Sequence, residues 1–342
     1  MLSTAAAPNT RSDAFKERYL QAYRWMLLAR IAEEKVAALY RGGKIIGGVF
    51  LGRGQEALSA ATALALRKGD IFAPLIRDQA GRFAFGETPL DAFRTYLGSR
   101  LGPMRGRDGN IHRGRPREGY YPMISHLGAM VPVVSGTLLA RRLRGENGTV
   151  GATCIGEGGT STGAFHEGLN LAAVEKLPLV LVVANNQYAY STPNSRQFAC
   201  ADLIDRALGY GVEGHTVDGT DLAACLETLQ DATDRARSGR GPQLIVAHLL
   251  RLVGHGEHDD ASYVDPALRT APIGRDCLAV AEKQIAAEKW ATKAELDQWR
   301  SIAITQMEEA MATALRESPP DPSAETWSAI STVHLRDDAT SS

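Results

Sequence analysis

The chain reads TVGATCIGEGGTSTGAFHEGLNLAAVEKLPLVLVVANN from Thr149 to Asn186. Apolar residues dominate positions 149–155 and 177–184, which predicts two short buried strands, and residues 164–176 are typical of a helix. A glycine-rich turn at 156–163 separates the first strand from the helix. Because a strand, a helix and a second strand in this order form a βαβ unit, the stretch predicts an α/β fold.

The flanking sequence extends this alternation of helices and strands. We expect helices at 14–41, 55–67, 132–144 and 222–238, and strands at 71–78 and 243–250. Together these elements predict a parallel sheet with helices on both faces. Residues 101–121 are rich in Gly, Arg, His and Pro, which indicates a long irregular loop. The predicted domain covers 14–317 and begins with a helical segment, between a disordered tail at 1–13 and a loosely packed C-terminal tail at 318–342.

Composition and charge exclude several classes of protein. The 342 residues carry a formal net charge of -1, with a pI near 6.7, so no overall attraction to nucleic acid or anionic lipid is expected. No apolar run approaches the roughly 20 residues that span a bilayer. The four cysteines are scattered without CxxC pairs, which is typical of reduced thiols in a cytoplasmic protein. We therefore expect neither a nucleic-acid nor a membrane partner.

Polar residues follow both strands of the opening stretch. Glu157 comes after the first strand and Asn186 after the second, so a carboxylate and a carboxamide oxygen can converge at one edge of a parallel sheet. Such oxygens suit Mg²⁺. Gly158 and Gly159 let the backbone approach a ligand closely, and the N-terminus of the following helix favours phosphate. The sequence therefore predicts a diphosphate held through Mg²⁺.

Two other glycine motifs do not fit the spacing. A dinucleotide-binding GxGxxG would need glycine at 161, where Ser161 stands, and the Gly-Lys-Ser/Thr of a P-loop is absent. A glycine-rich turn without a ligand is the alternative for an isolated turn. The Asn185-Asn186 pair at the next strand end favours a binding site instead.

The acidic glycine turn, followed 29 residues after Glu157 by the second Asn of an Asn-Asn pair, resembles the thiamine diphosphate motif. The sequence around this motif is similar to that of the alpha subunits of pyruvate, branched-chain 2-oxo acid and acetoin dehydrogenases. Further matches occur in family order at 39–45, 54–57, 77–78, 106–112, 125–128 and 254–260. The resemblance implies the transketolase-like diphosphate-binding fold, with thiamine diphosphate and Mg²⁺ as cofactors.

The resemblance also assigns residues to the diphosphate end of the cofactor. It implies that Glu157, the side chain of Asn186 and the backbone carbonyl of Tyr188 are metal ligands. Arg77 would meet the diphosphate, where a guanidinium supplies a fixed charge and directional donors. His255 would be a catalytic residue near both the diphosphate and the reactive carbon.

A second group of residues would hold the rings of the cofactor. Ser125 and Leu127 fall where the family binds the aminopyrimidine and the thiazolium, and Leu127 would support the bent cofactor from below. His126 would lie beside the reactive carbon as a possible catalytic or substrate contact. A structural histidine is the equal alternative for this residue.

Several positions depart from the family pattern. Glu157 replaces the usual Asp, Ile76 replaces a tyrosine, and Gly256 replaces a serine that can be phosphorylated. Phe50 and Gln79 both replace histidines, and Phe50 favours a larger or more apolar 2-oxo acid. The His- and acid-rich run at 255–260 could instead be read as a metal cluster, although one loop seldom preorganises such a site.

The family works with other chains. The resemblance implies a transketolase-like beta subunit in an α₂β₂ heterotetramer, a 2-oxo acid substrate and a lipoyl acyltransferase as the next partner. Two alternatives stay open: a subunit of a thiamine-dependent decarboxylase or acetoin-type C–C ligase, and a non-catalytic relic that only binds the cofactor or a partner.

Overall fold

The computed structural model describes residues 12–109 and 112–326. Its main sheet has five parallel strands in the order β1-β2-β3-β7-β6. The strands are β1 (Ile71–Ala73), β2 (Gly151–Gly156), β3 (Leu179–Asn185), β6 (Glu213–Asp218) and β7 (Gln243–His248). A small hairpin pairs β4 (Tyr188–Ala189) with β5 (Thr192–Pro193). The predicted α/β fold with a parallel sheet is confirmed.

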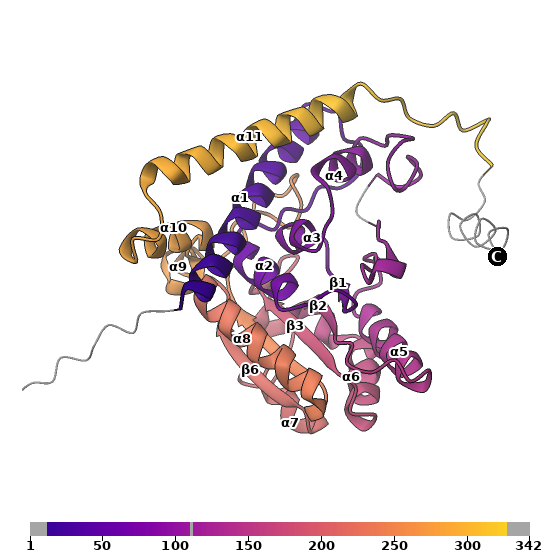
Figure 1. Cartoon of the computed structure of the whole chain (residues 1–342), viewed down its shortest axis with the longest axis vertical. Helices are drawn as coiled ribbons and strands as arrows, with labels where there is room; N and C mark the ends of the chain where they lie inside the picture. The colour runs from indigo at the N-terminus through magenta and orange to yellow at the C-terminus, as the bar shows by residue number, and fades with distance from the viewer. Residues whose placement is uncertain (1–11, 110–111, 327–342) are drawn as a thin grey trace, which may run out of the picture.

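Helices cover both faces of the sheet (Figure 1). The α-helices of the described chain are α1 (Asp13–Arg41), α2 (Glu56–Leu64), α3 (Gln79–Ala84), α4 (Pro89–Tyr96), α5 (Met130–Leu143), α6 (Gly163–Val174), α7 (Asp205–Tyr210), α8 (Leu222–Arg235), α9 (Pro266–Thr270), α10 (Cys277–Ala287) and α11 (Lys293–Leu315). Helices α5, α6 and α7 pack on one face, whereas α1, α2 and α8 share a core with the other.

The central strands are buried on both faces, and their side chains alternate between two cores. Ala152 and Cys154 of β2 belong to the core beneath α1, α2 and α8, and Ile155 belongs to the core beneath α5 and α6. Val182 and Val183 of β3 divide in the same way. This period of two explains why both strands read as continuous apolar runs.

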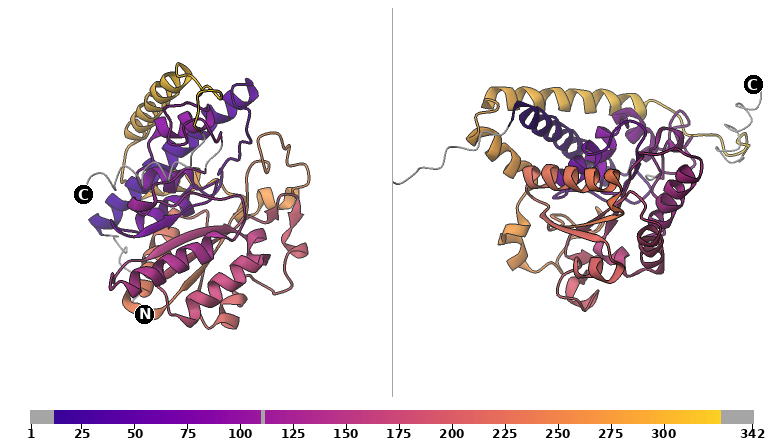
Figure 2. Two further views of the ribbon diagram at one scale, coloured as in Figure 1. Left: turned by 90° about the vertical axis from the view of Figure 1, so that its right-hand side faces the viewer. Right: turned by 60° about the horizontal axis from the view of Figure 1, so that its bottom comes forward.

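The first and last long helices lie side by side above the sheet (Figures 1 and 2). The side chain of Ser12 caps α1, and Gly42 follows the last residue of that helix, as its sequence predicts. Thr292 and Glu295 form a capping box at the start of α11. Both ends of the described chain therefore contribute to one helical layer.

The structure corrects two expectations about the strands. The strand expected at 71–78 ends at Ala73, because Pro74 has no N–H to continue the ladder, and Arg77 lies in the turn before α3. The edge strand β6 was not predicted. Its residues alternate between partly buried and exposed, and Glu213 and Asp218 make it read as a polar loop.

The expected tails fall largely outside the described residues. Of residues 1–13, only Ser12 and Asp13 are described, where they begin α1. Of residues 318–342, those after 326 lie outside the described chain, and the described part contacts the irregular loop through Arg107 and Glu325. Along 12–109 and 112–326, no helix is long and apolar enough to cross a bilayer.

Candidate functional site

The carboxyl ends of the parallel strands bring polar residues from distant parts of the sequence to one edge of the sheet. Gly156 of β2 pairs with Ala184 of β3, and Asn185 of β3 pairs with His248 of β7. Glu157 and Asn186 follow these positions directly, and the loop with His255 follows β7. Ligands of open α/β sheets bind at this edge.

Glu157 lies at the centre of a group of oxygens. Its carboxylate accepts hydrogen bonds from the backbone N–H of Asn186 at 3.2 Å and from Gln197 Nε2 at 3.4 Å. Asn186 Oδ1 accepts a hydrogen bond from the N–H of Tyr188 at 3.4 Å. Glu157 is only 1% exposed, and this burial raises its pKa. Gln197 Oε1 is also buried, with no hydrogen-bond donor among the described residues.

The glycines after β2 are required by close packing. A Cβ on Gly158 would lie 2.5 Å from Ala189 Cβ, and one on Gly159 would lie 2.7 Å from Ile155 Cγ1. The side chain of Thr162 caps α6 by accepting from the N–H of Phe165. A side chain at either position would therefore force a neighbouring residue to shift, and the turn ends at a helix N-terminus.

Arg77 and His255 meet at the same edge. Arg77 Nη2 donates to the backbone carbonyl of His255 at 2.6 Å and lies 3.4 Å from Nδ1 of its ring. Burial and the neighbouring Arg251 lower the pKa of Arg77 to about 10, so the guanidinium is still charged at neutral pH. Partial burial and both arginines lower the pKa of His255 to about 4, which leaves a neutral imidazole.

Arg251 is a site residue that sequence reasoning missed. It is 3% exposed, and it donates from Nη1 to the carbonyl oxygen of Tyr188 at 3.0 Å. From Nη2 it donates to the carbonyl of Tyr190 at 2.7 Å and to the hydroxyl of Tyr263 at 2.6 Å. Arg251 interrupts an apolar run directly after β7, which is the sequence signal that could have identified it.

The predicted ring-binding residues lie on an exposed segment against the glycine turn. Ser125, His126 and Leu127 are all exposed, and Leu127 is 51% exposed despite being apolar. A Cβ on Gly159 would lie 3.6 Å from Leu127 Cβ, so Leu127 reaches the turn that follows β2. His126 lines a small cavity with Cys154 of β2.

The two histidine replacements lie in different places. The Phe50 ring packs edge-on against His255, with 5.3 Å between centroids, and faces the Arg77 guanidinium at 5.9 Å. Gln79 is buried away from this group and donates from Nε2 to Glu87 at 2.8 Å. Phe50 is therefore the replacement that belongs to the strand-end site.

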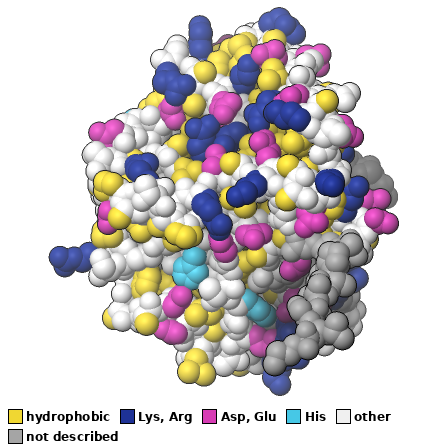
Figure 3. All heavy atoms as spheres, turned by 90° about the vertical axis from the view of Figure 1, so that its left-hand side faces the viewer, with side chains coloured by type: hydrophobic (Ala, Val, Ile, Leu, Met, Phe, Trp, Pro, Cys, Tyr) yellow, Lys and Arg dark blue, Asp and Glu magenta, His cyan; other side chains and the backbone are white. Residues whose placement is uncertain are grey.

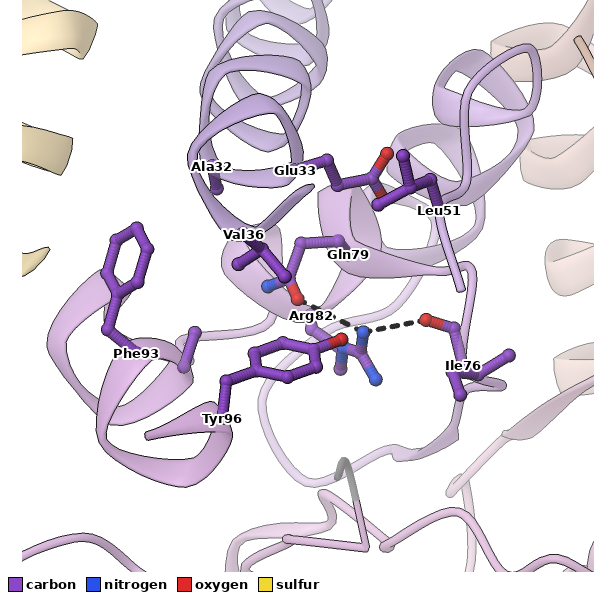
Figure 4. A pocket seen from close by; sticks show the side chains of 10 residues that line it. Ala32, Glu33, Val36, Leu51, Ile76, Gln79, Arg82, Phe93 and Tyr96 are labelled. Carbon is purple, nitrogen blue, oxygen red and sulfur yellow. Dashed lines mark hydrogen bonds between the residues drawn. The ribbon is translucent and has the colours of Figure 1, made fainter. Parts of the chain in front are cut away.

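Glu87 is the centre of a second buried polar cluster. Its carboxylate accepts from Nε and Nη2 of Arg113, from Gln79 and from the hydroxyl of Tyr120. Although burial alone would raise it, the two nearby arginines lower the pKa of Glu87 to about 2. Figure 4 shows the second of these, Arg82, reaching Gln79 and the backbone carbonyl of Ile76 beside a small cavity.

No three His, Cys, Asp or Glu side chains gather into a metal-binding group within the part of the chain that the structure describes. The acidic loop at 255–260 thus forms no such cluster. Its Asp259 instead accepts from the N–H of His255 at 2.5 Å and from the hydroxyl of Tyr263 at 2.6 Å.

Figure 3 shows basic and acidic side chains interspersed over one face of the molecule.

The sheet and the polar groups at its carboxyl edge define an α/β protein with a strand-end binding site. Residues 23–323 match the family Dehydrogenase E1 component, and the chain belongs to this family. The resemblance seen in the sequence is thereby confirmed.

Curated relatives cover most of the chain. It is 34% identical over 323 residues to the alpha subunit of acetoin:2,6-dichlorophenolindophenol oxidoreductase from Cupriavidus necator, which covers 94% of this chain and 97% of the relative. It is 38% identical to the 2-oxoisovalerate dehydrogenase subunit alpha of Bacillus subtilis, over 73% of this chain and 78% of the relative. For the pyruvate dehydrogenase E1 component subunit alpha of Rhizobium meliloti, the identity is 33%, over 85% and 84%.

Proposed function

We propose that this chain is the thiamine-diphosphate-binding alpha subunit of a heteromeric 2-oxo acid dehydrogenase. The observation that carries the proposal is the presence of two buried charges of opposite sign at the sheet edge, which are not hydrogen-bonded to each other. Among the described residues, Glu157 is a buried acid that receives no hydrogen bond from a cationic side chain, and the hydrogen-bond partners of the buried Arg77 guanidinium are the carbonyl and the imidazole of His255. A divalent cation beside Glu157 and a diphosphate beside Arg77 complement both charges.

The donor set fits these groups. Glu157, the side chain of Asn186 and the carbonyl of Tyr188 would hold Mg²⁺. The buried Gln197 Oε1, which has no donor among the described residues, adds a fourth oxygen near the same carboxylate. The carbonyl oxygen of Tyr188 accepts one hydrogen bond from Arg251, which leaves its second lone pair for the metal. Thiamine diphosphate, when bound, supplies the electron sink for decarboxylation of a 2-oxo acid.

The residues of this chain would then bind, orient and exclude water. Arg77 would fix the diphosphate through charge and directional donors. His255 is neutral at physiological pH, so one ring nitrogen carries a proton that it can donate, and the other can accept. The Phe50 and Tyr190 rings pack against His255 and restrict water on that side.

The exposed ring-binding segment supports a partner subunit. Leu127 presents an apolar side chain next to the glycine turn, where a second chain could cover it. Relatives of nearly equal length are named as alpha subunits. We therefore include in the proposal a beta subunit, an α₂β₂ assembly and acyl transfer to a lipoyl group, and a cytoplasmic location remains a prediction.

Isothermal titration calorimetry tests the cofactor part of the proposal. The chain, alone and with its co-expressed beta subunit, would be titrated with thiamine diphosphate in the presence and absence of Mg²⁺. We expect Mg²⁺-dependent binding that Glu157→Gln weakens. If no heat of binding is measured even with the beta subunit present, the catalytic proposal is contradicted. The remaining interpretation is then that the chain is a non-catalytic relic of the family.

The relative that acts on acetoin gives a second candidate, a subunit of a thiamine-dependent enzyme that handles acetoin. Product analysis distinguishes the two. The assembled complex would receive pyruvate, branched-chain 2-oxo acids or acetoin, with an artificial electron acceptor. Oxidative decarboxylation of a 2-oxo acid supports the first candidate, and turnover of acetoin alone supports the second.

A further inference from the structure

Asp108, His112 and Ser125 form a hydrogen-bonded chain in the irregular loop. His112 Nδ1 lies 2.5 Å from Asp108 Oδ2, and His112 Nε2 lies 2.9 Å from Ser125 Oγ. The three side chains come from two segments that are separated by residues 113–124. Carboxylate, imidazole and hydroxyl therefore follow one another in the order used by serine nucleophiles.

The order of atoms fixes what each group can do. Because a carboxylate only accepts hydrogen bonds, Nδ1 must carry the proton that is shared with Asp108. In the neutral imidazole, Nε2 is then unprotonated and accepts from the Ser125 hydroxyl. His112 is thus positioned as a base for Ser125, and Asp108 orients His112 and stabilises its protonated form.

Access to the serine is open in the described chain. Ser125 is exposed, and the side chains of His112 and Asp108 are 27% and 25% exposed. The backbone N–H groups of His126 and Leu127 have no acceptor among the described residues. An N–H directly after a nucleophilic serine is well placed to stabilise a developing oxyanion.

We infer that Ser125 is an activated serine that accepts acyl and phosphonyl groups. With a small ester, Ser125 Oγ forms a bond to the carbonyl carbon, and His112 Nε2 takes the hydroxyl proton. The bond to the leaving alkoxide breaks, and that alkoxide receives the proton from His112. Water then hydrolyses the acyl-serine by the same route in reverse. This activity needs no thiamine diphosphate, so it can be tested on the chain without the cofactor that the proposed function places beside Ser125.

Labelling with an alkyl fluorophosphonate tests the inference directly. The probe replaces its P–F bond with a bond to the serine oxygen and releases fluoride. The full-length chain would be treated with the probe, digested, and mapped by mass spectrometry. We expect modification of Ser125, with a rate that falls on the order of 100-fold in His112→Gln and by a smaller factor in Asp108→Asn.

The controls separate activation from simple exposure. Ser238 is also exposed, but its hydroxyl donates to the carbonyl of Arg235, so Ser238→Ala should leave the labelling unchanged. Ser125→Ala should abolish it. Circular dichroism spectra would show that each variant is folded. No label on Ser125 in the folded wild-type chain, or equal labelling rates in wild type and His112→Gln, would overturn the inference.

Discussion

Glu87 and Glu157 are both almost fully buried, and their surroundings change their pKa values in opposite directions. Glu87 accepts two hydrogen bonds from Arg113 and others from Gln79 and Tyr120, and its pKa is lowered to about 2. Within the described chain, Glu157 accepts only from a backbone N–H and an amide, and its burial raises its pKa. The charged form of glutamate is thus stabilised at Glu87 and destabilised at Glu157.

The difference separates a structural cluster from a binding site. A buried carboxylate that its own chain neutralises with arginine has no need of a ligand and ties a loop to a helix. A buried carboxylate that its own chain leaves without a bonded cation is costly unless something else supplies the charge. We interpret Glu87 as the anchor of the loop that contains Arg113, and Glu157 as the acid that a metal ion would neutralise.

The largest effect is expected at the structural cluster. Glu87→Ala leaves Arg113 buried without its carboxylate and should lower the free energy of unfolding by about 3–5 kcal/mol. Urea denaturation followed by circular dichroism measures this loss. Glu118 is a matched control, because its pair with Arg115 is exposed, and Glu118→Ala should cost less than about 1 kcal/mol. Similar losses in both variants would remove Glu87 from its structural role.

The site glutamate should behave in the opposite way. Glu157→Gln removes a buried charge and should change the free energy of unfolding by less than about 1 kcal/mol, since the amide keeps most hydrogen bonds. Affinity for Mg²⁺-thiamine diphosphate should fall by about 100-fold or more, because the metal loses a charged ligand. Calorimetry on the assembled complex measures the affinity.

Glu157→Asp is the control for that substitution. It keeps the charge and shortens the side chain by one methylene, so the affinity loss should be smaller, on the order of tenfold. Unchanged cofactor affinity in Glu157→Gln, with a large loss of stability, would show that Glu157 is a structural residue like Glu87.

The fold could be predicted wherever burial is complete on both sides of a strand. The apolar runs of β2 and β3 identified the parallel sheet, since side chains on both faces enter a core. The edge strand β6 was not predicted, because half of its residues face away from the core. Similarly, β1 was predicted too long, because the prediction continued the apolar run past Pro74, which has no N–H to donate to the ladder.

The site could be predicted only in part. Glu157 and Asn186 directly follow strands, so their convergence follows from parallel pairing. Arg251 and Gln197 lie in irregular segments, and their contacts depend on how loops fold over the sheet edge. The hydrogen bonds from Asp108 through His112 to Ser125 join side chains across such a loop. The periodic pattern of apolar residues does not predict contacts of this kind.

Lowering the pH should gradually remove the contribution of the Glu87 carboxylate to the free energy of unfolding. The folded pKa is lowered to about 2 from 4.5, so this carboxylate stabilises the fold fully above pH 4.5 and loses its contribution as the pH falls toward 2. The stability difference between wild type and Glu87→Gln should therefore narrow by about 1 kcal/mol between pH 4.5 and 3.5. Urea titrations at both pH values measure it, and a difference that does not narrow would contradict the lowered pKa.

The smallest effect is expected at the substrate end, where Phe50 packs against His255 without contributing a charge or a hydrogen bond. Phe50→His adds a polar ring at the position where the sequence resemblance implies a histidine in pyruvate-type subunits. It should shift the ratio of kcat/KM for pyruvate over a branched-chain 2-oxo acid by about fivefold toward pyruvate, the size typical of a single pocket contact. Affinity for the cofactor should stay within about twofold, because Arg77 and Glu157 are unchanged. Steady-state assays of the assembled complex would measure the ratio. A loss of cofactor affinity with an unchanged ratio would place Phe50 at the diphosphate end instead.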